Sequence, residues 1–175
     1  MYARPVGELR KELCATLRHA HNKRLPRSKG KDRRGQIPDM LSIHVRPPEI
    51  EDRQFPGHWE GDLIKGEGNA SAVGTLVERT SRLVMLVKLP EFKPASATNV
   101  LQAFTDKLLG IAQPMRLSMT YDQGREMSMH KKLSEQTGIA VYFCDPHSPW
   151  QRGSNENMNG LVRQYLPKGT DLSIY

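Results

Sequence analysis

The pattern of apolar and polar positions divides the chain into a polar N-terminal fifth and a longer region of regular periodicity. Leucines recur every fourth residue over 8–20, which predicts a short amphipathic helix. A polar, turn-rich loop over 22–35 follows, and four prolines over 36–57 indicate an extended connector. Regular structure is expected to begin at residue 58.

Beyond residue 58 the periodicity alternates between that of strands and that of helices. Three strands are predicted over 58–65, 72–78 and 83–89, and the short turns between them make an antiparallel meander. The elements predicted after them are a helix over 97–111, a strand over 115–121, a helix over 127–137 ended by Gly138, a strand over 139–144, and a helix capped by Ser154 and running to about Leu166.

The order of these elements, β-β-β-α-β-α-β-α, defines the expected fold class. Three consecutive strands followed by alternating helices and strands predict an α/β fold with a five-stranded mixed sheet and helices on both faces. We expect this core to occupy residues 36–175 and a basic helix and linker to occupy residues 1–35.

The composition bears on the cellular location of the protein and on its use of cysteine. No apolar run approaches the roughly 18 residues that a membrane span needs, and the N-terminus has no signal-peptide pattern. Cys14 and Cys144 make no disulfide framework, so we interpret them as reduced thiols in the cytosol, with Cys144 buried in a strand. A zinc site at Cys14, His19 and His21 is rejected because a fourth ligand is missing.

The net charge of +7 comes entirely from the N-terminal segment. Residues 1–34 hold eleven Lys and Arg against three acidic residues, a balance of +8, whereas the other 141 residues carry −1. A basic block beside a near-neutral domain favours a polyanionic partner, most simply nucleic acid. The alternative is a solvated basic linker.

Three acidic residues lie at positions where a functional site is expected. Asp62 lies inside a predicted strand, Asp122 at the end of another strand, where open α/β sheets bind ligands, and Glu156 in the first turn of the last helix. Each alone would be a surface carboxylate or a helix cap. Together they predict a site for Mg²⁺ or Mn²⁺, and two such ions support in-line phosphoryl displacement without a protein nucleophile.

Four motifs resemble the DDE transposases of the insertion-sequence-thirty family, and the resemblance extends over about residues 36–175. Thirty-three residues separate Asp122 from Glu156, which is the spacing of that family. The most specific motif is the block of proline loop and helix that ends at Glu156. The motifs are His-Trp-Glu-Gly-Asp at 58–62, Tyr-Asp-Gln-Gly-Arg-Glu at 121–126, Tyr-Phe-Cys-Asp-Pro-His-Ser-Pro-Trp-Gln-Arg-Gly-Ser-Asn-Glu-Asn at 142–157 and Leu-Pro-Lys-Gly-Thr-Asp at 166–171.

The resemblance implies an RNase H-like integrase core that binds two Mg²⁺ or Mn²⁺ ions through Asp62, Asp122 and Glu156. It implies cleavage of transposon ends and their transfer into target DNA, with double-stranded DNA as substrate and a homo-oligomer as the working assembly. A bacterial cytoplasmic location at the nucleoid is expected. Gln123 and Met127 replace the Asn and Phe that are frequent in the family, which affects the support of the ligands rather than the ligands themselves.

Several neighbouring residues are assigned subsidiary roles. Glu60 shares the strand face of Asp62 under a period of two, but the family motif favours Asp62 as the ligand, and Glu60→Gln is expected to retain activity. His147 and Arg152 would contact DNA or order the site, and Trp150 is interpreted as a core residue rather than a base-stacking one. DNA contacts are expected from Arg163, Arg152 and Lys168 and from Arg33 and Arg34 in the basic segment.

Two alternatives stay open. The chain lacks the N-terminal helix-turn-helix region and the further helix of the family, so we expect a fragment truncated at the C-terminus; a catalytically inactive remnant that only binds DNA or other subunits is the alternative. A structure-selective RNase H-type nuclease would use the same metal chemistry, and the motif at residues 149–153 counts against it.

Overall fold

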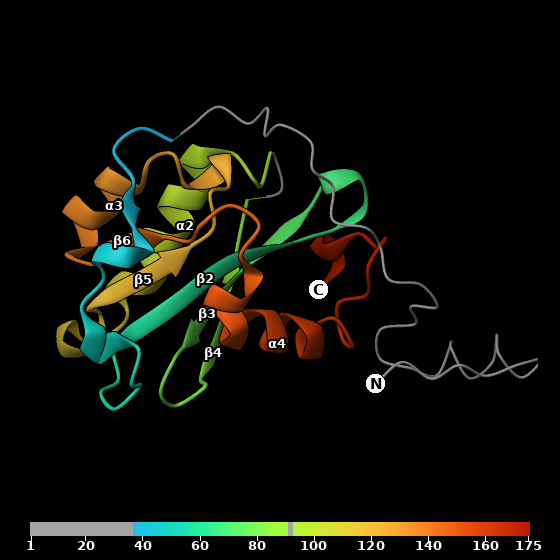
Figure 1. Cartoon of the computed structure of the whole chain (residues 1–175). Helices are drawn as coiled ribbons and strands as arrows, with labels where there is room; N and C mark the ends of the chain where they lie inside the picture. Colours follow the sequence, from blue (N-terminus) through green and yellow to red (C-terminus); the bar gives the residue numbers. More distant parts are fainter. Residues whose placement is uncertain (1–36, 91–92) are drawn as a thin grey trace, which may run out of the picture. The chain divides into compact units, whose positions relative to one another are not determined.

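A six-stranded mixed β-sheet organises the part of the chain that the structure, a computed structural model, describes: residues 37–90 and 93–175 (Figure 1). These residues belong to one compact unit that runs from Arg34 to Tyr175. The helix predicted over 8–20, the basic segment with Arg33 and Arg34, and Cys14 lie outside the described residues.

The strand order in the sheet is β1-β6-β5-β2-β3-β4. Strands β2, β3 and β4 form an antiparallel meander, whereas β1, β6, β5 and β2 pair in parallel. The expected meander and mixed sheet are therefore confirmed. The strands are β1 (Leu41–Ser42), β2 (His58–Lys65), β3 (Ala72–Glu78), β4 (Val84–Lys88), β5 (Ser118–Tyr121) and β6 (Ala140–Phe143).

The prediction of five strands was wrong by one. Strand β1 falls within the segment that was expected to be an extended connector, and it pairs only with β6 at the edge of the sheet. Both of its residues are exposed, so no alternation of buried and exposed positions marks it in the sequence.

The helices are α2 (Ala97–Leu109), α3 (His130–Thr137) and α4 (Gly153–Val162). Helix α3 begins three residues later than predicted because residues 125–127 form a separate 3-10 turn. It ends as predicted at Gly138, which adopts a left-handed conformation with φ of 74° and donates its N–H to the carbonyl of Ser134. No helix of the described ranges combines the length and the apolar character that a membrane crossing requires.

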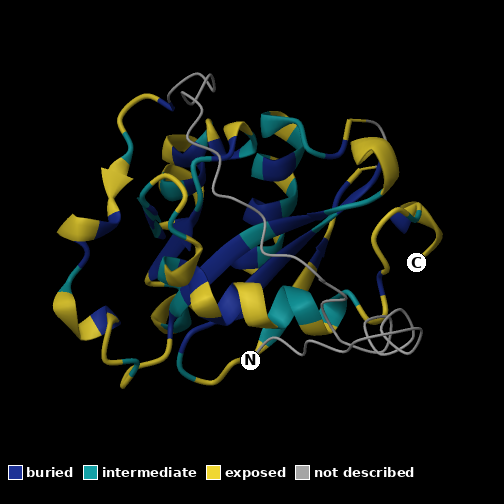
Figure 2. Ribbon diagram, turned by 45° about the vertical axis from the view of Figure 1, so that its right-hand side comes forward, coloured by how far each residue is buried: buried dark blue, intermediate teal, exposed yellow. Residues whose placement is uncertain are grey.

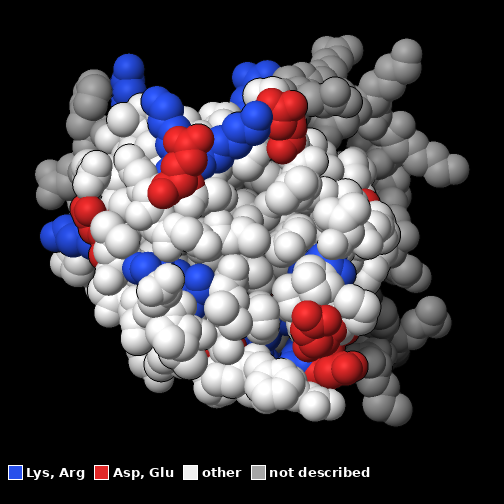
Figure 3. Space-filling view, turned by 90° about the vertical axis from the view of Figure 1, so that its left-hand side faces the viewer, with Lys and Arg blue, Asp and Glu red and all other residues white. Residues whose placement is uncertain are grey.

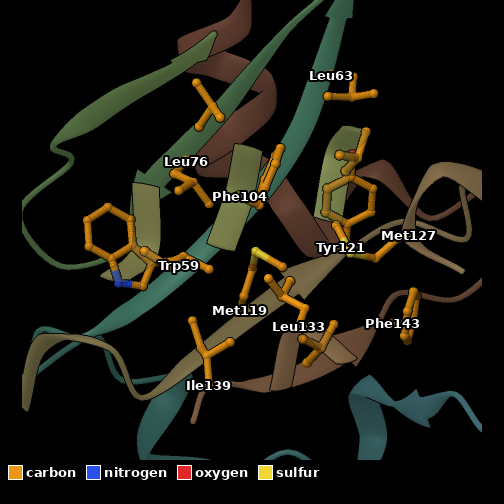
Figure 4. Packing of buried hydrophobic residues seen from close by; sticks show 14 of the residues in the cluster. Trp59, Leu63, Leu76, Phe104, Met119, Tyr121, Met127, Leu133, Ile139 and Phe143 are labelled. Carbon is orange, nitrogen blue, oxygen red and sulfur yellow. The ribbon is translucent and has the colours of Figure 1, made fainter. Parts of the chain in front are cut away.

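One face of the sheet carries the hydrophobic core. Trp59 of β2 and Met119 and Tyr121 of β5 pack with Phe104 of α2 on this face, and all four are essentially fully buried (Figure 4). Gly61 leaves the room for this packing, because a Cβ atom there would lie 2.8 Å from the ring of Tyr121. Figure 2 shows the central strands as buried and the outer sides of the helices as exposed.

The opposite face of the sheet is covered by α4 and has a different character. Residues 60, 62 and 64 of β2 lie on this face because side chains alternate along a strand. Ile64 packs with Leu166 and Leu172 into a small second cluster, whereas Glu60 and Asp62 meet polar side chains of α4. The α4 face therefore holds charged groups against a rigid sheet.

Candidate active site

Backbone pairing in the sheet brings Asp62 and Asp122 together. Strands β2 and β5 are parallel, and each of residues 58–60 pairs with the residue sixty positions later, 118–120. Continued by two residues, this register places Asp122 beside Asp62 on the same face. Neighbouring strands lie about 4.8 Å apart, so the two carboxylates share one small region.

Arg152 lies between these two carboxylates. Its Nη1 atom is 3.5 Å from Oδ2 of Asp62, and its Nη2 atom is 3.6 Å from Oδ2 of Asp122. Nη1 also donates a hydrogen bond of 2.9 Å to the carbonyl of Gly61. Because only 8% of its side chain is exposed, Arg152 orders the aspartate pair and does not extend into solvent as a DNA contact would.

Two hydrogen bonds hold the Asp62 carboxylate, and its surroundings shift its pKa. Its Oδ1 atom accepts the N–H of Leu63 at 2.8 Å, and its Oδ2 atom accepts the side-chain amide of Asn159 at 2.9 Å. Burial raises the pKa of Asp62, Arg152 opposes this effect, and the neighbouring charge of Asp122 adds to it. A cation at this position would therefore relieve an electrostatic cost.

Asp122 is the more open member of the pair. Its Oδ1 atom accepts the N–H of Gly124 at 2.9 Å, and 39% of its side chain is exposed. Glu126 lies a few residues further along, and its charge also raises the pKa of Asp62. The carboxylate of Glu126 is 3.4 Å from the amine of Lys65. No role was predicted for Glu126 from the sequence, although it belongs to the same motif as Asp122.

Glu156 lies on the stripe of α4 that faces the aspartate pair. Residues 156, 159 and 163 are spaced by three and four positions, which places them along one side of α4 and its C-terminal cap, and Arg152 directly precedes the helix. Arg152 and Asn159 contact Asp62, and Nη2 of Arg163 donates to the carbonyl of Lys65 at 2.9 Å, at the end of β2. Glu156 stands between the first two of these contacts, but its own side chain is exposed.

The three predicted ligands do not form a ready cluster. Within residues 37–90 and 93–175, no three His, Cys, Asp or Glu side chains gather closely enough to hold a metal ion. The structure brings together Asp62 and Asp122 and leaves Glu156 exposed on the adjacent helix. Lys168, predicted as a DNA contact, is also exposed.

The start of α4 is fixed by Glu60 rather than by the predicted cap Ser154. The helix begins at Gly153, and Ser154 is buried inside its first turn. Oε2 of Glu60 accepts the N–H of Asn155 at 2.8 Å, and the side-chain amide of Asn155 donates to the carbonyl of Glu60 at 2.8 Å. A carboxylate at a helix N-terminus satisfies free N–H groups and complements the helix dipole.

Glu60 therefore has a structural role, so Glu60→Gln, which was expected from the family motif to retain activity, is not a neutral change for the fold. It is fully buried, and Nη1 of Arg79 lies 3.4 Å from its Oε1 atom. Asn155 and Asn159 were missed by sequence analysis. Their spacing of four residues on a polar helix was the available signal, because it places two amides on one side of the helix.

The remaining predictions in this region have mixed outcomes. Trp150 is 64% exposed, so its interpretation as a core residue was wrong; it follows Pro149 in a short surface 3-10 helix. His147 is also exposed. The burial expected for Cys144 is confirmed, one residue beyond strand β6, and burial raises the pKa of its thiol to about 11.

The two departures from the family pattern have structural roles. Nε2 of Gln123 donates to the carbonyl of Cys144 at 3.0 Å, which ties the segment after β5 to the segment after β6. Met127 is 2% exposed and packs into the main core.

Charges on the described surface are mixed. On the face drawn in Figure 3, Lys and Arg side chains lie next to Asp and Glu side chains, and the described atoms show no broad area of one sign. This agrees with the near-neutral balance of the chain beyond residue 34.

Comparison with known proteins shows which family the chain resembles. The integrase core domain family matches residues 52–149. The transposase for insertion sequence element IS1086 of Cupriavidus metallidurans is 67% identical over the whole chain, and the chain covers 51% of that protein. Transposase InsI for insertion sequence element IS30A of Escherichia coli is 45% identical over 91% of this chain, which covers 41% of it.

A relative of lower identity is also a transposase of an insertion sequence. The transposase for insertion sequence element IS4351 of Bacteroides fragilis is 34% identical over 80% of this chain, which covers 42% of that protein. The chain thus spans about half the length, or less, of these relatives. From its sheet, its aspartate pair and these matches, the chain belongs to the integrase core domain family, in the group that contains the IS30 transposases.

Proposed function

We propose that this chain is the catalytic domain of a DNA transposase, a polynucleotidyl transferase that cleaves transposon ends and joins them to target DNA. Asp62, Asp122 and Glu156 are its metal ligands in this proposal. The observation that carries it is the shared register of β2 and β5, which sets two aspartates side by side below the helix that bears Glu156.

The residues at this position suit a hard divalent cation. Carboxylate oxygens are the ligands that Mg²⁺ and Mn²⁺ prefer, and the guanidinium of Arg152 already places positive charge between the two aspartates. Two bound Mg²⁺ or Mn²⁺ ions would supply charge neutralisation for the attacking and leaving oxygens of a phosphoryl displacement. Glu156, exposed on the same stripe of α4, is free to turn toward them by a change of side-chain rotamer.

The other side chains of the site act by positioning. Asn159 fixes the orientation of the Asp62 carboxylate, and Arg152 places its positive charge between the two aspartates. Glu60 anchors the start of α4, and thereby the turn that carries Glu156. Positioning of this kind supplies most of the catalysis in phosphoryl transfer, where the protein performs little covalent chemistry.

Double-stranded DNA is the proposed substrate, and a homo-oligomer acting on chromosomal DNA in the bacterial cytoplasm is the proposed assembly. Relatives named as transposases of insertion sequences support this assignment. Within the chain, Arg163 and Lys168 lie beyond Glu156, and the segment of residues 1–34 supplies the excess positive charge. Each phosphate that such residues neutralise lowers the slope of log K against log salt by roughly 0.9.

The test is a nicking and strand-transfer assay in Mg²⁺ on DNA that carries the ends of the element, with the protein that contains this domain. Asp62→Asn, Asp122→Asn and Glu156→Gln should each abolish both reactions, because each removes a negative charge and keeps the size of the side chain. DNA binding in EDTA should persist in all three variants.

The matched control is Glu135→Gln, an equally conservative change at an exposed residue of α3. It should leave both reactions unchanged. Nicking by the Asp122→Asn protein at the wild-type rate would refute the ligand assignment. A wild-type protein that binds DNA and never nicks it would identify the domain as a catalytically inactive DNA-binding module.

A further inference from the structure

A polar pocket of about 250 Å³ opens on the sheet face that carries the aspartate pair. Two buried arginines and an exposed tryptophan line it. Its lining includes His44, Arg46, Glu51, Arg53, Arg79 and Trp150. The proposed catalytic role uses none of these six residues, and only Trp150 among them belongs to a family motif.

Arg46 and Arg79 are held in the pocket as a pair of buried cations. Arg46 is 7% exposed and Arg79 is 3% exposed, and Nη1 of Arg46 donates to Oγ1 of Thr120 at 2.9 Å. The Nε atoms of both arginines are buried without a hydrogen-bond partner. Burial and mutual repulsion lower the pKa of Arg46 to about 10. Two such cations, with spare donors, require an anion.

Glu60 already pairs with Arg79, and the carboxylate that contacts both arginines is Glu51. Its Oε1 atom is bonded to Nη2 of Arg46, and its Oε2 atom lies 3.3 Å from Nη2 of Arg79. The side chain of Glu51 is nevertheless 62% exposed. An exposed carboxylate that offers one oxygen to each of two buried guanidinium groups has the geometry with which phosphate oxygens meet arginine pairs.

The position of this pair relative to the aspartates follows from the strands. Arg46 contacts Thr120, two residues before Asp122 on β5, and Arg79 contacts Glu60, two residues before Asp62 on β2. Side chains two residues apart share a face, so both arginines lie on the face of the aspartate pair. Thr120 and Glu60, the residues that the arginines contact, precede the aspartates by only about 7 Å along their strands, so the arginine pair neighbours the aspartate pair.

We propose that Arg46 and Arg79 bind a backbone phosphate of the DNA strand that enters the Asp62–Asp122 site, and that the Glu51 carboxylate occupies this place until DNA displaces it. The proposal rests on the proposed function for the identity of the strand. Arg53, which also lines the pocket, adds positive potential, and Glu51 tunes the affinity by competing with the phosphate.

The experiment measures binding of a fluorescent DNA duplex to the 175-residue chain by anisotropy in EDTA, at several salt concentrations. Glu51→Gln should raise the affinity by about fivefold, the ratio that one surface ion pair is worth, because the competing charge is gone. Arg79→Gln should weaken binding and make the slope of log K against log salt less negative by about 0.9.

The control is Glu49→Gln, which removes the same charge from an exposed neighbour that does not line the pocket. A thermal melt of each variant separates loss of binding from loss of fold, and Glu51→Gln alone decides the matter where Arg79→Gln does not fold. An affinity gain in Glu51→Gln no larger than in Glu49→Gln would overturn the proposal. So would an unchanged salt slope in a folded Arg79→Gln protein.

Inorganic phosphate tests whether the pocket binds a phosphate of DNA or a small free anion. Thermal stabilisation by inorganic phosphate that is lost in Arg79→Gln, with DNA affinity unchanged in every variant, would assign the site to a small free anion and refute the DNA proposal. Because all these measurements are made without divalent metal, their outcome is independent of whether the aspartate triad nicks DNA.

Discussion

Removal of Arg152 tests whether this side chain neutralises the aspartate pair. The change is Arg152→Gln, which deletes the positive charge and retains a polar side chain next to the carbonyl of Gly61. The charged hydrogen bond of 2.9 Å to that carbonyl and the contacts of 3.5 and 3.6 Å to Asp62 and Asp122 are all lost. Two neighbouring carboxylates are then left with no counter-charge between them.

The size of the effect follows from burial. Breaking a fully buried ion pair costs about 3–5 kcal/mol, because the partner remains buried and unpaired. Here the side chains of Asp62 and Asp122 are 25% and 39% exposed, so water screens part of their repulsion, and we expect a loss of about 2–3 kcal/mol. For a chain of this length that corresponds to a fall in Tm of about 4–12 °C.

The assay is a double-mutant cycle by denaturant unfolding in metal-free buffer. Arg152→Gln should cost at least about 1 kcal/mol less in an Asp62→Asn background, since one of the two repelling charges is then absent. Addition of Mg²⁺ should raise the Tm of the Arg152→Gln protein more than that of the wild type. Arg125→Gln, a change of the same charge at an exposed residue, is the control. Additive free energies and an equal response to Mg²⁺ would refute the reasoning.

Three further expectations concern stability. Glu60→Gln should destabilise the fold by about 3 kcal/mol or more in denaturant unfolding, because Arg79 and the start of α4 lose a fully buried carboxylate; a loss below 1 kcal/mol would contradict this role. Burial disfavours the charged form of Glu78, but hydrogen bonds from the turn that follows it outweigh burial and hold its pKa below the usual 4.5. The stability of the fold should therefore fall as the pH drops below about 4.5. Thermal melts across pH should show a smaller fall in Glu78→Gln than in the wild type. Gly74→Ala should cost about 1–3 kcal/mol by the same unfolding measurement, because a Cβ atom there would lie 2.6 Å from the ring of Phe104, and an unchanged midpoint would show that the ring moves freely.

The parts of the fold that sequence analysis predicted best are those governed by local periodicity. Strands β2 and β3 have the predicted bounds, because their alternation is bounded by turn residues that stop a strand. Gly138 ends α3 because a left-handed residue was required there. Strand β1 was missed because two exposed residues carry no periodic signal, and only pairing with β6 defines it.

Interactions between distant residues account for what was missed at the site. The carboxylate that stabilises the start of α4 belongs to Glu60, 95 positions before Asn155, so the local rule that pointed to Ser154 was wrong. The bond between Arg46 and Thr120 joins residues 74 positions apart. The proximity of Asp62 and Asp122 could be expected from two strand ends, but Arg152 between them depends on the path of a loop that has no periodicity.

The constant offset of sixty residues between β2 and β5 has a consequence for how this domain tolerates sequence change. The separation of the two aspartates is set by peptide hydrogen bonds rather than by the fit of side chains, so mutations that repack the core leave it nearly constant. Insertions in the loops between the two strands are absorbed at the surface and do not reach the pair. A slip of a single residue within β5, by contrast, would turn Asp122 to the face of Phe104 and bury it in the core. Sequence drift in most of the intervening chain therefore leaves the spacing of the two aspartates unchanged, whereas an insertion or deletion inside four residues, Ser118–Tyr121, would dismantle the site.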